Sequence, residues 1–243
     1  MSKVVDELVQ LLALERLEDN LFRGPSQDLG WGTVFGGQVL GQALSAAAQT
    51  VPRERAAHSL HAYFLRPGDP AVPILYEVDR IRDGKSFTTR RVVAVQDGHA
   101  IFTMAASFQL HETGFEHQAT SPGATPPETL ASELELARKF AHRIPEPLRE
   151  QATCERPLEI RPLDPYDPMR PDVRPPQRSV WYRAIDKLPD RSSVHQYLLA
   201  YASDFNLLGV SMQPHGVSGV SLARADIESR VRGHASGAWR SGS

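Results

Sequence analysis

The sequence predicts an α+β fold in which an antiparallel sheet curls around one central helix. Residues 33–50, TVFGGQVLGQALSAAAQT, read as a helix of unusually small side chains, and residues 58–110 read as strand and turn almost throughout. Glycine costs a helix about 1 kcal/mol relative to alanine, so Gly36, Gly37 and Gly41 require close packing or close approach of a ligand. A sheet pressed against this helix would meet that requirement.

The N-terminal residues predict an amphipathic helix that packs on the body of the protein. Acidic side chains such as Asp6 and Glu7 interrupt its apolar positions, and no small-residue cleavage site follows, which argues against a signal peptide. The apolar positions are Val4, Val5, Leu8, Leu11, Leu12 and Leu14. No apolar run approaches the roughly 20 residues that a membrane span needs.

The composition is that of an ordinary globular protein, with 41% hydrophobic and 23% charged residues. A length of 243 residues allows one large domain or two small ones. The formal net charge of -2 gives no electrostatic reason to expect nucleic acid or a membrane surface as a partner. The single cysteine, Cys154, cannot form an internal disulfide, so we expect a protein of the reducing cytoplasm.

Strand signals follow the small-residue helix. A short strand is expected at 21–22, and longer strands at 58–65, 74–82, 86–96 and 100–110. The dipeptides Asp83-Gly84 and Asp97-Gly98 separate the last three strands, and Asp-Gly between β-rich runs is a strong hairpin signal. Some strands are apolar on both faces, so one face can cover the helix while the other meets a second sheet or subunit.

The second half begins to repeat this order of elements. A surface helix is expected at 128–142, strands at 158–161 and 179–184, and a second helix to be enclosed at 193–209. The residues that follow lack the alternation of a sheet. We therefore expect a first domain at 1–112, a linker with a surface helix and a Pro-rich segment at 113–177, a partial second domain at 178–220, and a disordered tail at 221–243.

Motifs in both halves carry a family resemblance. They are VFGGQV at 34–39, GQA at 41–43, HS at 58–59, YFLRPG at 63–68, RDGKSF at 82–87, RRV at 90–92, YASDFNLL at 201–208 and QPHG at 213–216. In this combination and order the chain resembles the medium-chain acyl-CoA thioesterase II family (TesB-like), whose subunits are two fused hotdog domains. The resemblance runs from residue 1 to about residue 219.

The resemblance implies a double hotdog fold whose second hotdog is incomplete. In the family, later strands of the second hotdog carry a hydroxyl residue and a glutamine that assist a catalytic aspartate. The strand expected after Gly219 is not found, so neither partner is transferred to this chain. The abrupt change there leads us to expect a truncated or frame-shifted C-terminus.

The resemblance also implies hydrolysis of fatty acyl-CoA to free fatty acid and CoA by activated water, a reaction of lipid metabolism. It maps the catalytic aspartate onto Asp204, within YASDFNLL. Neither a metal nor another cofactor is expected. The expected partner is the acyl-CoA substrate, and the two-faced strands and the family favour a homo-oligomer. The alternative is a catalytically impaired or non-catalytic hotdog fragment that only binds acyl groups or partner subunits.

The candidate site residues each have a structural alternative. Asp204 interrupts an apolar stretch, which raises the pKa of a carboxyl and suits a base, but Ser203 or Asp204 could instead cap a helix that begins there. Gly37 and Gln38 are candidate substrate-binding residues, because backbone N–H groups at a helix start can receive a carbonyl oxygen. The alternative is that the glycines serve only close packing.

Two further sets of side chains are candidate ligands. His58 and His61 lie three residues apart on a strand and face opposite sides, which argues against a shared metal. Arg90 and Arg91 could meet the phosphates of coenzyme A, although arginines on strands more often form a solvated or paired face.

Overall fold

The computed structural model describes residues 2–120 and 123–219. They form two compact units. Unit 1 comprises Met1–Gly123, Cys154–Glu159 and Tyr182–Phe205, and unit 2 comprises Ala124–Thr153, Ile160–Trp181 and Asn206–Ser243. The division of the chain at 112, 177 and 220 stays a prediction, and the expected disordered tail at 221–243 lies outside the described residues.

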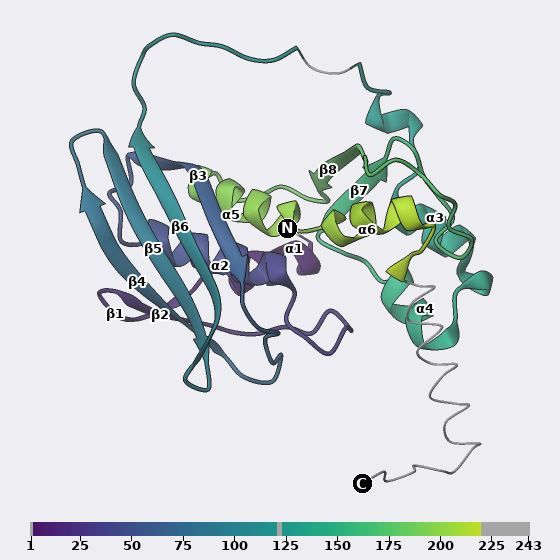
Figure 1. The fold of residues 1–243 in the computed structure, drawn as a ribbon, viewed down its shortest axis with the longest axis horizontal. Helices are drawn as coiled ribbons and strands as arrows, with labels where there is room; N and C mark the ends of the chain where they lie inside the picture. The colour runs from purple at the N-terminus through teal and green to yellow at the C-terminus, as the bar shows by residue number, and fades with distance from the viewer. Residues whose placement is uncertain (1, 121–122, 220–243) are drawn as a thin grey trace, which may run out of the picture. The chain divides into compact units, whose positions relative to one another are not determined.

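Unit 1 holds one antiparallel sheet and the helices that pack on it (Figure 1). The sheet order is β1-β2-β4-β5-β6-β3. Its strands are β1 (Glu15–Glu18), β2 (Leu21–Gly24), β3 (Arg55–Phe64), β4 (Ile74–Asp83), β5 (Phe87–Gln96) and β6 (His99–Leu110). Its helices are α1 (Lys3–Leu12), α2 (Gly36–Ala48) and α5 (Ser192–Ser203).

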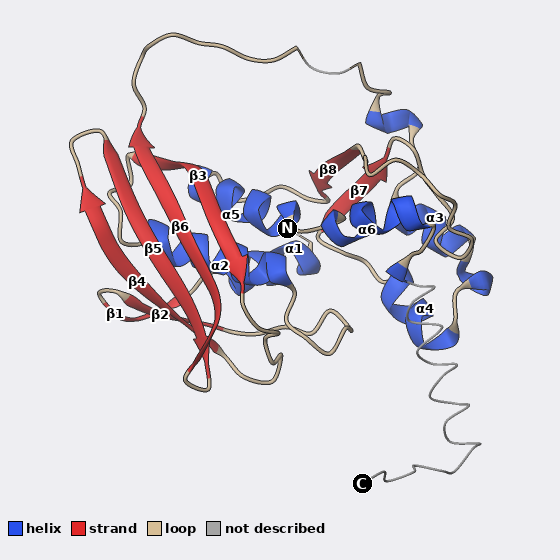
Figure 2. Cartoon of the chain, in the orientation of Figure 1, coloured by secondary structure: helices blue, strands red, loops and turns tan. Residues whose placement is uncertain are grey.

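Helix α2 is the centre of unit 1. It lies along one face of the sheet, and α1 and α5 pack against it (Figure 2). Its small side chains, among them Ala43, Ala46 and Ala47, are completely buried against sheet residues such as Tyr76 and Val92. The predicted arrangement of a sheet around a small-residue helix is therefore confirmed.

The hairpin between β5 and β6 follows its sequence signal. Asp97 and Gly98 both have positive φ, 47° and 74°. Two successive left-handed residues form the turn that matches the twist of the flanking strands, and Asp-Gly is a preferred pair for it. The loop between β4 and β5 is longer, and the N–H of Gly84 donates to the carbonyl of Phe87 at 2.8 Å.

Unit 2 consists mainly of short elements. These are η1 (Pro127–Thr129), α3 (Glu133–Lys139), η2 (Ala141–Arg143), α4 (Glu146–Thr153), α6 (Leu207–Met212) and η3 (Gln213–His215). Strands β7 (Leu158–Pro162) and β8 (Val180–Ala184) pair as a two-stranded sheet whose residues are shared between the units. None of the helices within residues 2–120 and 123–219 has the length and hydropathy that a membrane span requires.

Two predicted helices have the wrong extent. The single helix expected at 128–142 is broken into α3 and parts of the short 3₁₀ helices η1 and η2. Helix α3 begins at a capping box formed by Ser132 and Glu135 and ends before Phe140. The helix expected at 193–209 is two helices, α5 and α6. The chain breaks between them because Asn206 takes a left-handed conformation with φ 71°, which asparagine tolerates better than most residues.

Arg90 has an environment that the sequence did not indicate. Its side chain is 1% exposed and inaccessible to a ligand in solvent. Its Nε donates to Oγ1 of Thr50 at 2.8 Å, and its Nη2 donates to the Thr50 carbonyl at 3.0 Å and to Asp83 at 2.6 Å. Because Thr50 lies just beyond the end of α2, the guanidinium fastens strand β5 to the carboxyl end of the central helix, where a cation is favourable.

We expect Arg90→Met to lower the free energy of unfolding by about 2 kcal/mol, because methionine leaves the buried acceptors at Thr50 without a donor. The matched control is Arg91→Met on the same strand. Arg91 forms an ion pair with Asp79 in which both side chains are more than half exposed, so its loss should cost less than about 1 kcal/mol. Urea denaturation measures both values. Equal losses in the two variants would contradict the role given to Arg90.

Candidate active site

The carboxylate of Asp204 lies at the amino end of α2. Asp204 directly follows α5 and caps its carboxyl end. The backbone N–H of Gly37 donates a hydrogen bond to this carboxylate. A Cβ added at Gly36 would lie only 2.6 Å from Oδ2 of Asp204. The acid is therefore held against the first turn of the central helix, whose partial positive charge favours an anion.

Burial and the Gly37 hydrogen bond act in opposite directions on the pKa of Asp204. Burial is the larger effect and raises the pKa of the half-buried carboxyl, whereas the N–H of Gly37 lowers it. The net result is a pKa above the ordinary value for aspartate. A carboxylate of raised pKa accepts a proton more readily than a solvated one, which suits a general base.

The alternative interpretation of Asp204 and Ser203 as caps of a following helix is wrong. Helix α6 begins at Leu207, and its N-cap is Asn206. The hydroxyl of Ser203 donates backward to the carbonyl of Ala200 at 2.8 Å. Asp204 thus ends one helix instead of starting another, and its side chain is directed at Gly36 and Gly37 of α2.

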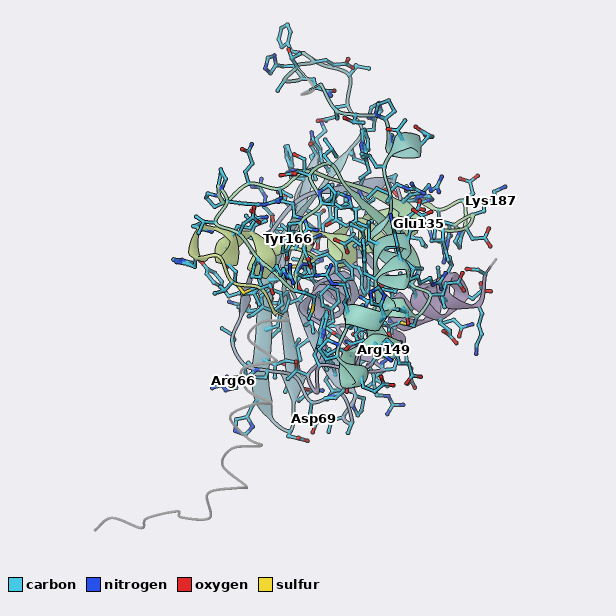
Figure 3. The ribbon with its side chains drawn as sticks, turned by 90° about the vertical axis from the view of Figure 1, so that its right-hand side faces the viewer. Arg66, Asp69, Glu135, Arg149, Tyr166 and Lys187 are labelled. Atoms are coloured by element: carbon cyan, nitrogen blue, oxygen red, sulfur yellow. The ribbon has the colours of Figure 1, made fainter. Side chains whose placement is uncertain are left out.

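A pocket of about 340 Å³ opens beside Gly36. Its lining is mainly apolar and includes Val34, Val39, Phe64, Ile101 and Phe102. Arg66, labelled in Figure 3, lies on its rim and donates to the carbonyl of Ala100 at 2.6 Å. The volume falls within the range of roughly 300–1,000 Å³ that is usual for small-molecule sites.

The pocket and the carboxylate of Asp204 both border Gly36, although Asp204 is not one of the residues that line the pocket. A Cβ at this position would approach Asp204 on one side and a ring carbon of Phe64, at 2.9 Å, on the other. Phe64 lines the pocket. Because glycine has no side chain, no Cβ stands between the carboxylate of Asp204 and the ring of Phe64 at this point.

An aromatic cluster adjoins Asp204 through Phe205, the next residue of the chain. We define it as Trp31, Phe35, Tyr201 and Phe205. The ring of Phe35 is tilted against that of Phe205 with centroids 4.5 Å apart, and it meets Tyr201 edge-on at 5.2 Å. Trp31 meets Phe35 with ring centroids 5.7 Å apart.

Gly37 and Gln38 occupy different surroundings. A Cβ at Gly37 would collide with the carbonyl oxygen of Tyr201, which supports the close-packing alternative for this glycine. The side chain of Gln38 is 1% exposed, and its Nε2 donates to the carbonyl of Pro25 at 2.9 Å. Its backbone N–H donates to Phe35. Gln38 therefore holds the segment that leads into α2.

Several site features gave little or no sequence signal. Phe64 and Phe102 belong to separate strands, and their meeting at the pocket depends on the pairing of β3 with β6. The pattern Asp28-x-Gly30-x-Gly32 does signal a turn near the site.

Across residues 2–120 and 123–219, no three His, Cys, Asp or Glu side chains gather closely enough to hold a metal ion.

Known families match most of the chain. A family described as the acyl-CoA thioesterase N-terminal domain matches residues 25–109, and one described as acyl-CoA thioesterase matches residues 147–229. The chain is 43% identical over 215 residues to acyl-CoA thioesterase 2 of Haemophilus influenzae, covering 88% of this chain and 75% of that protein. It is 38% identical over 213 residues to human acyl-coenzyme A thioesterase 8, covering 84% and 67%.

Solved structures share the architecture. An acyl-CoA thioesterase II, TesB2, from Mycobacterium marinum superposes with a TM-score of 0.64 at 38% identity, over 86% of this chain and 71% of that one. A hot dog fold protein of unknown function from Alicyclobacillus acidocaldarius superposes with a TM-score of 0.59 at 20% identity, over 82% and 68%, which concerns the fold alone. The hotdog prediction is confirmed, and the small β7-β8 sheet agrees with an incomplete second hotdog.

Proposed function

The chain belongs to the acyl-CoA thioesterase II family, and from this premise we propose that it hydrolyses fatty acyl-CoA to a free fatty acid and coenzyme A, with Asp204 as the general base. It is a thioester hydrolase of the hotdog fold. The observation that carries the assignment of Asp204 is the position of its carboxylate, which accepts the N–H of Gly37 and lies against Gly36, a residue that also lines the apolar pocket.

The proposed reaction needs no covalent intermediate. Asp204 takes a proton from a water molecule as the water oxygen attacks the thioester carbonyl. The negative charge that develops on the carbonyl oxygen is favoured by the positive amino end of α2. When the tetrahedral intermediate collapses, the carbon–sulfur bond breaks, and the proton held by Asp204 passes to the departing thiolate. The products are a fatty acid and the free thiol of coenzyme A.

The other site residues have supporting roles in this proposal. The apolar pocket beside Gly36 receives the acyl chain. Gly37 acts on the substrate through Asp204, whose carboxylate it orients, and Gln38 acts through the loop that it holds. Removal of a general base commonly lowers the rate by about 10² to 10⁴, so substitution of Asp204 should have the largest effect on turnover among these residues.

The direct experiment follows thiol release from a medium- or long-chain acyl-CoA by the 243-residue chain. Saturable turnover above the rate of a blank supports the proposal. If the chain bound acyl-CoA but released no thiol, the activity would have to be abandoned in favour of a binding role.

The pH dependence of kcat/KM provides a second test. A general base works only when it is ionised, so the rate should rise with pH through the pKa of Asp204 and then level off. Because burial raises this pKa, the inflection should lie above the ordinary aspartate value of about 3.9. The profile must be corrected for the reaction of hydroxide with the thioester. A rate that fell with rising pH over the acid range would contradict the base assignment.

We further propose that the protein is a cytoplasmic homo-oligomer that acts in lipid metabolism. The exposed apolar side chains of Leu60 and Tyr63 on β3 support association between copies. The single cysteine, Cys154, is compatible with a reducing compartment. Sedimentation of the purified chain tests the first part, since a monomer at micromolar concentration would exclude a stable oligomer.

A further inference from the structure

A half-exposed tryptophan lies beside the Asp204 site, and the reaction proposed above does not use it. Trp31 is 52% exposed, and its ring meets Phe35 edge-on with an interplanar angle of 65°. Phe35 in turn packs on Phe205, the residue that follows Asp204. Tryptophan has a large apolar ring with one polar N–H and is enriched at interfaces where one end of the ring meets an apolar partner.

The loop that carries Trp31 is ordered by hydrogen bonds to the side chain of Asp28. The carboxylate of Asp28 accepts hydrogen bonds from three successive backbone N–H groups, those of Gly30 at 2.7 Å, Trp31 at 2.9 Å and Gly32 at 3.1 Å. Gly30 and Gly32 have positive φ of 93° and 71°, which glycine adopts without strain. The hydrogen bond from Gly30, the largest influence, lowers the pKa of Asp28, so the acceptor stays ionised.

Both ends of this loop are fastened to the core of unit 1. At its start, the N–H of Gln27 donates to Oε1 of the buried Gln38 at 3.2 Å. The carbonyl of Pro25 accepts from Gln42 of α2 at 3.0 Å. At its end, the N–H of Val34 donates to the carbonyl of Gly68 at 2.9 Å. Trp31 is therefore presented at a defined position although half of its surface is free.

A thioester held at Asp204 has two arms that must leave in different directions. The pocket beside Gly36 is lined by Thr33, Val34 and Phe64 and does not include Trp31 or Phe35. An acyl chain in this pocket leaves the coenzyme A side of the carbonyl to pass along another surface. Phe205, the residue after Asp204, packs on Phe35, and Phe35 packs on Trp31, whose half-exposed ring is an apolar surface available to that arm.

We propose that Trp31 is a contact for the pantetheine arm of the coenzyme A substrate and that Asp28 is the positioning residue that presents it. The inference rests on the proposed function. The pantetheine arm alternates amides with alkyl groups, and the face of an indole ring packs well on both. Trp31 is two ring contacts from the residue next to Asp204. In coenzyme A the pantetheine arm lies between the sulfur and the nucleotide. A residue this close to Asp204 would therefore contact the arm and not the nucleotide.

The test compares two thioesters of the same fatty acid, one with coenzyme A and one with N-acetylcysteamine, which lacks most of the pantetheine arm. We expect Trp31→Ala to raise KM for the acyl-CoA about tenfold, with kcat changed less than twofold and with little change for the truncated thioester. A tenfold change corresponds to about 1.4 kcal/mol. Phe115→Ala is the matched control, because it removes another exposed aromatic ring in unit 1.

Asp28 variants test the positioning role. Asp28→Ala should raise KM for the acyl-CoA in the same selective way. Asp28→Asn keeps an oxygen acceptor, so its KM for the acyl-CoA should stay close to the wild-type value. A loss of stability alone would not discriminate between the two thioesters. The proposal is overturned if Trp31→Ala affects both thioesters equally, or affects neither.

A binding measurement separates failure of this inference from failure of the proposed function. Addition of coenzyme A should change the tryptophan fluorescence of the wild-type chain and of Trp181→Phe, but not that of Trp31→Phe. This readout does not require turnover. A saturable signal in a chain that hydrolyses nothing would support the subsite and refute the activity, and a signal that persists in Trp31→Phe would overturn the subsite.

Discussion

Replacement of Asp204 by asparagine should lower kcat for acyl-CoA hydrolysis by about 100- to 10,000-fold, the usual cost of removing a general base. Asparagine has nearly the same shape and its carbonyl oxygen can still accept the N–H of Gly37. It cannot take a proton from water. Steady-state thiol release at saturating substrate measures the effect, and KM should change much less than kcat.

The folded state should tolerate Asp204→Asn. Because burial raises the pKa of Asp204, the ionised carboxylate is less stable in the folded protein than in water, and a neutral amide relieves this cost. We therefore expect Tm to be unchanged or slightly higher. Asp190→Asn is the matched control, since Asp190 is an exposed carboxylate just before α5, at the end opposite Asp204. If both variants kept wild-type kcat, Asp204 would not be the base.

Gly37→Ala should lower the free energy of unfolding by about 3 kcal/mol, at the upper end of the usual cost of overpacking a core. The added Cβ would collide with the backbone carbonyl oxygen of Tyr201 and with the ring of Phe35. A backbone atom cannot move aside as a flexible side chain can. Helices α2 and α5 would have to separate, which would also displace Asp204 from the amino end of α2.

Gly114→Ala is the control for this substitution, because a Cβ at Gly114 meets nothing within 4 Å. Urea denaturation of the two variants, with the slope compared to confirm that the same surface is exposed on unfolding, gives the difference. A loss below about 0.5 kcal/mol at Gly37 would mean that the two helices are not in close contact there.

Local signals account for the part of the fold that the sequence predicted. The helix at α2 followed from its run of small residues, and the β5-β6 hairpin from Asp97 and Gly98. Each of these signals is contained within a few residues. The break after α5 was missed because apolar residues continue through it, and only the backbone of Asn206 reveals that the helix ends.

The site was predicted in its parts but not in its assembly. The glycines of α2 indicated that something approaches this helix closely, and the resemblance pointed to Asp204. The glycines and Asp204 form one site because α5 packs along α2, which brings together residues more than 160 positions apart in the sequence. Arg90 shows the same limit, since its burial depends on the meeting of β5 with the end of α2.

The most direct measurement of the central claim is a single turnover of a fatty acyl-CoA in H₂¹⁸O with enzyme in excess. If Asp204 activates water, the released fatty acid carries one ¹⁸O atom and the peptide that contains Asp204 carries none. If Asp204 instead attacked the carbonyl, the resulting anhydride would leave ¹⁸O in the Asp204 carboxylate when water attacked the aspartyl carbon. Label in that peptide, or no turnover, would contradict this account.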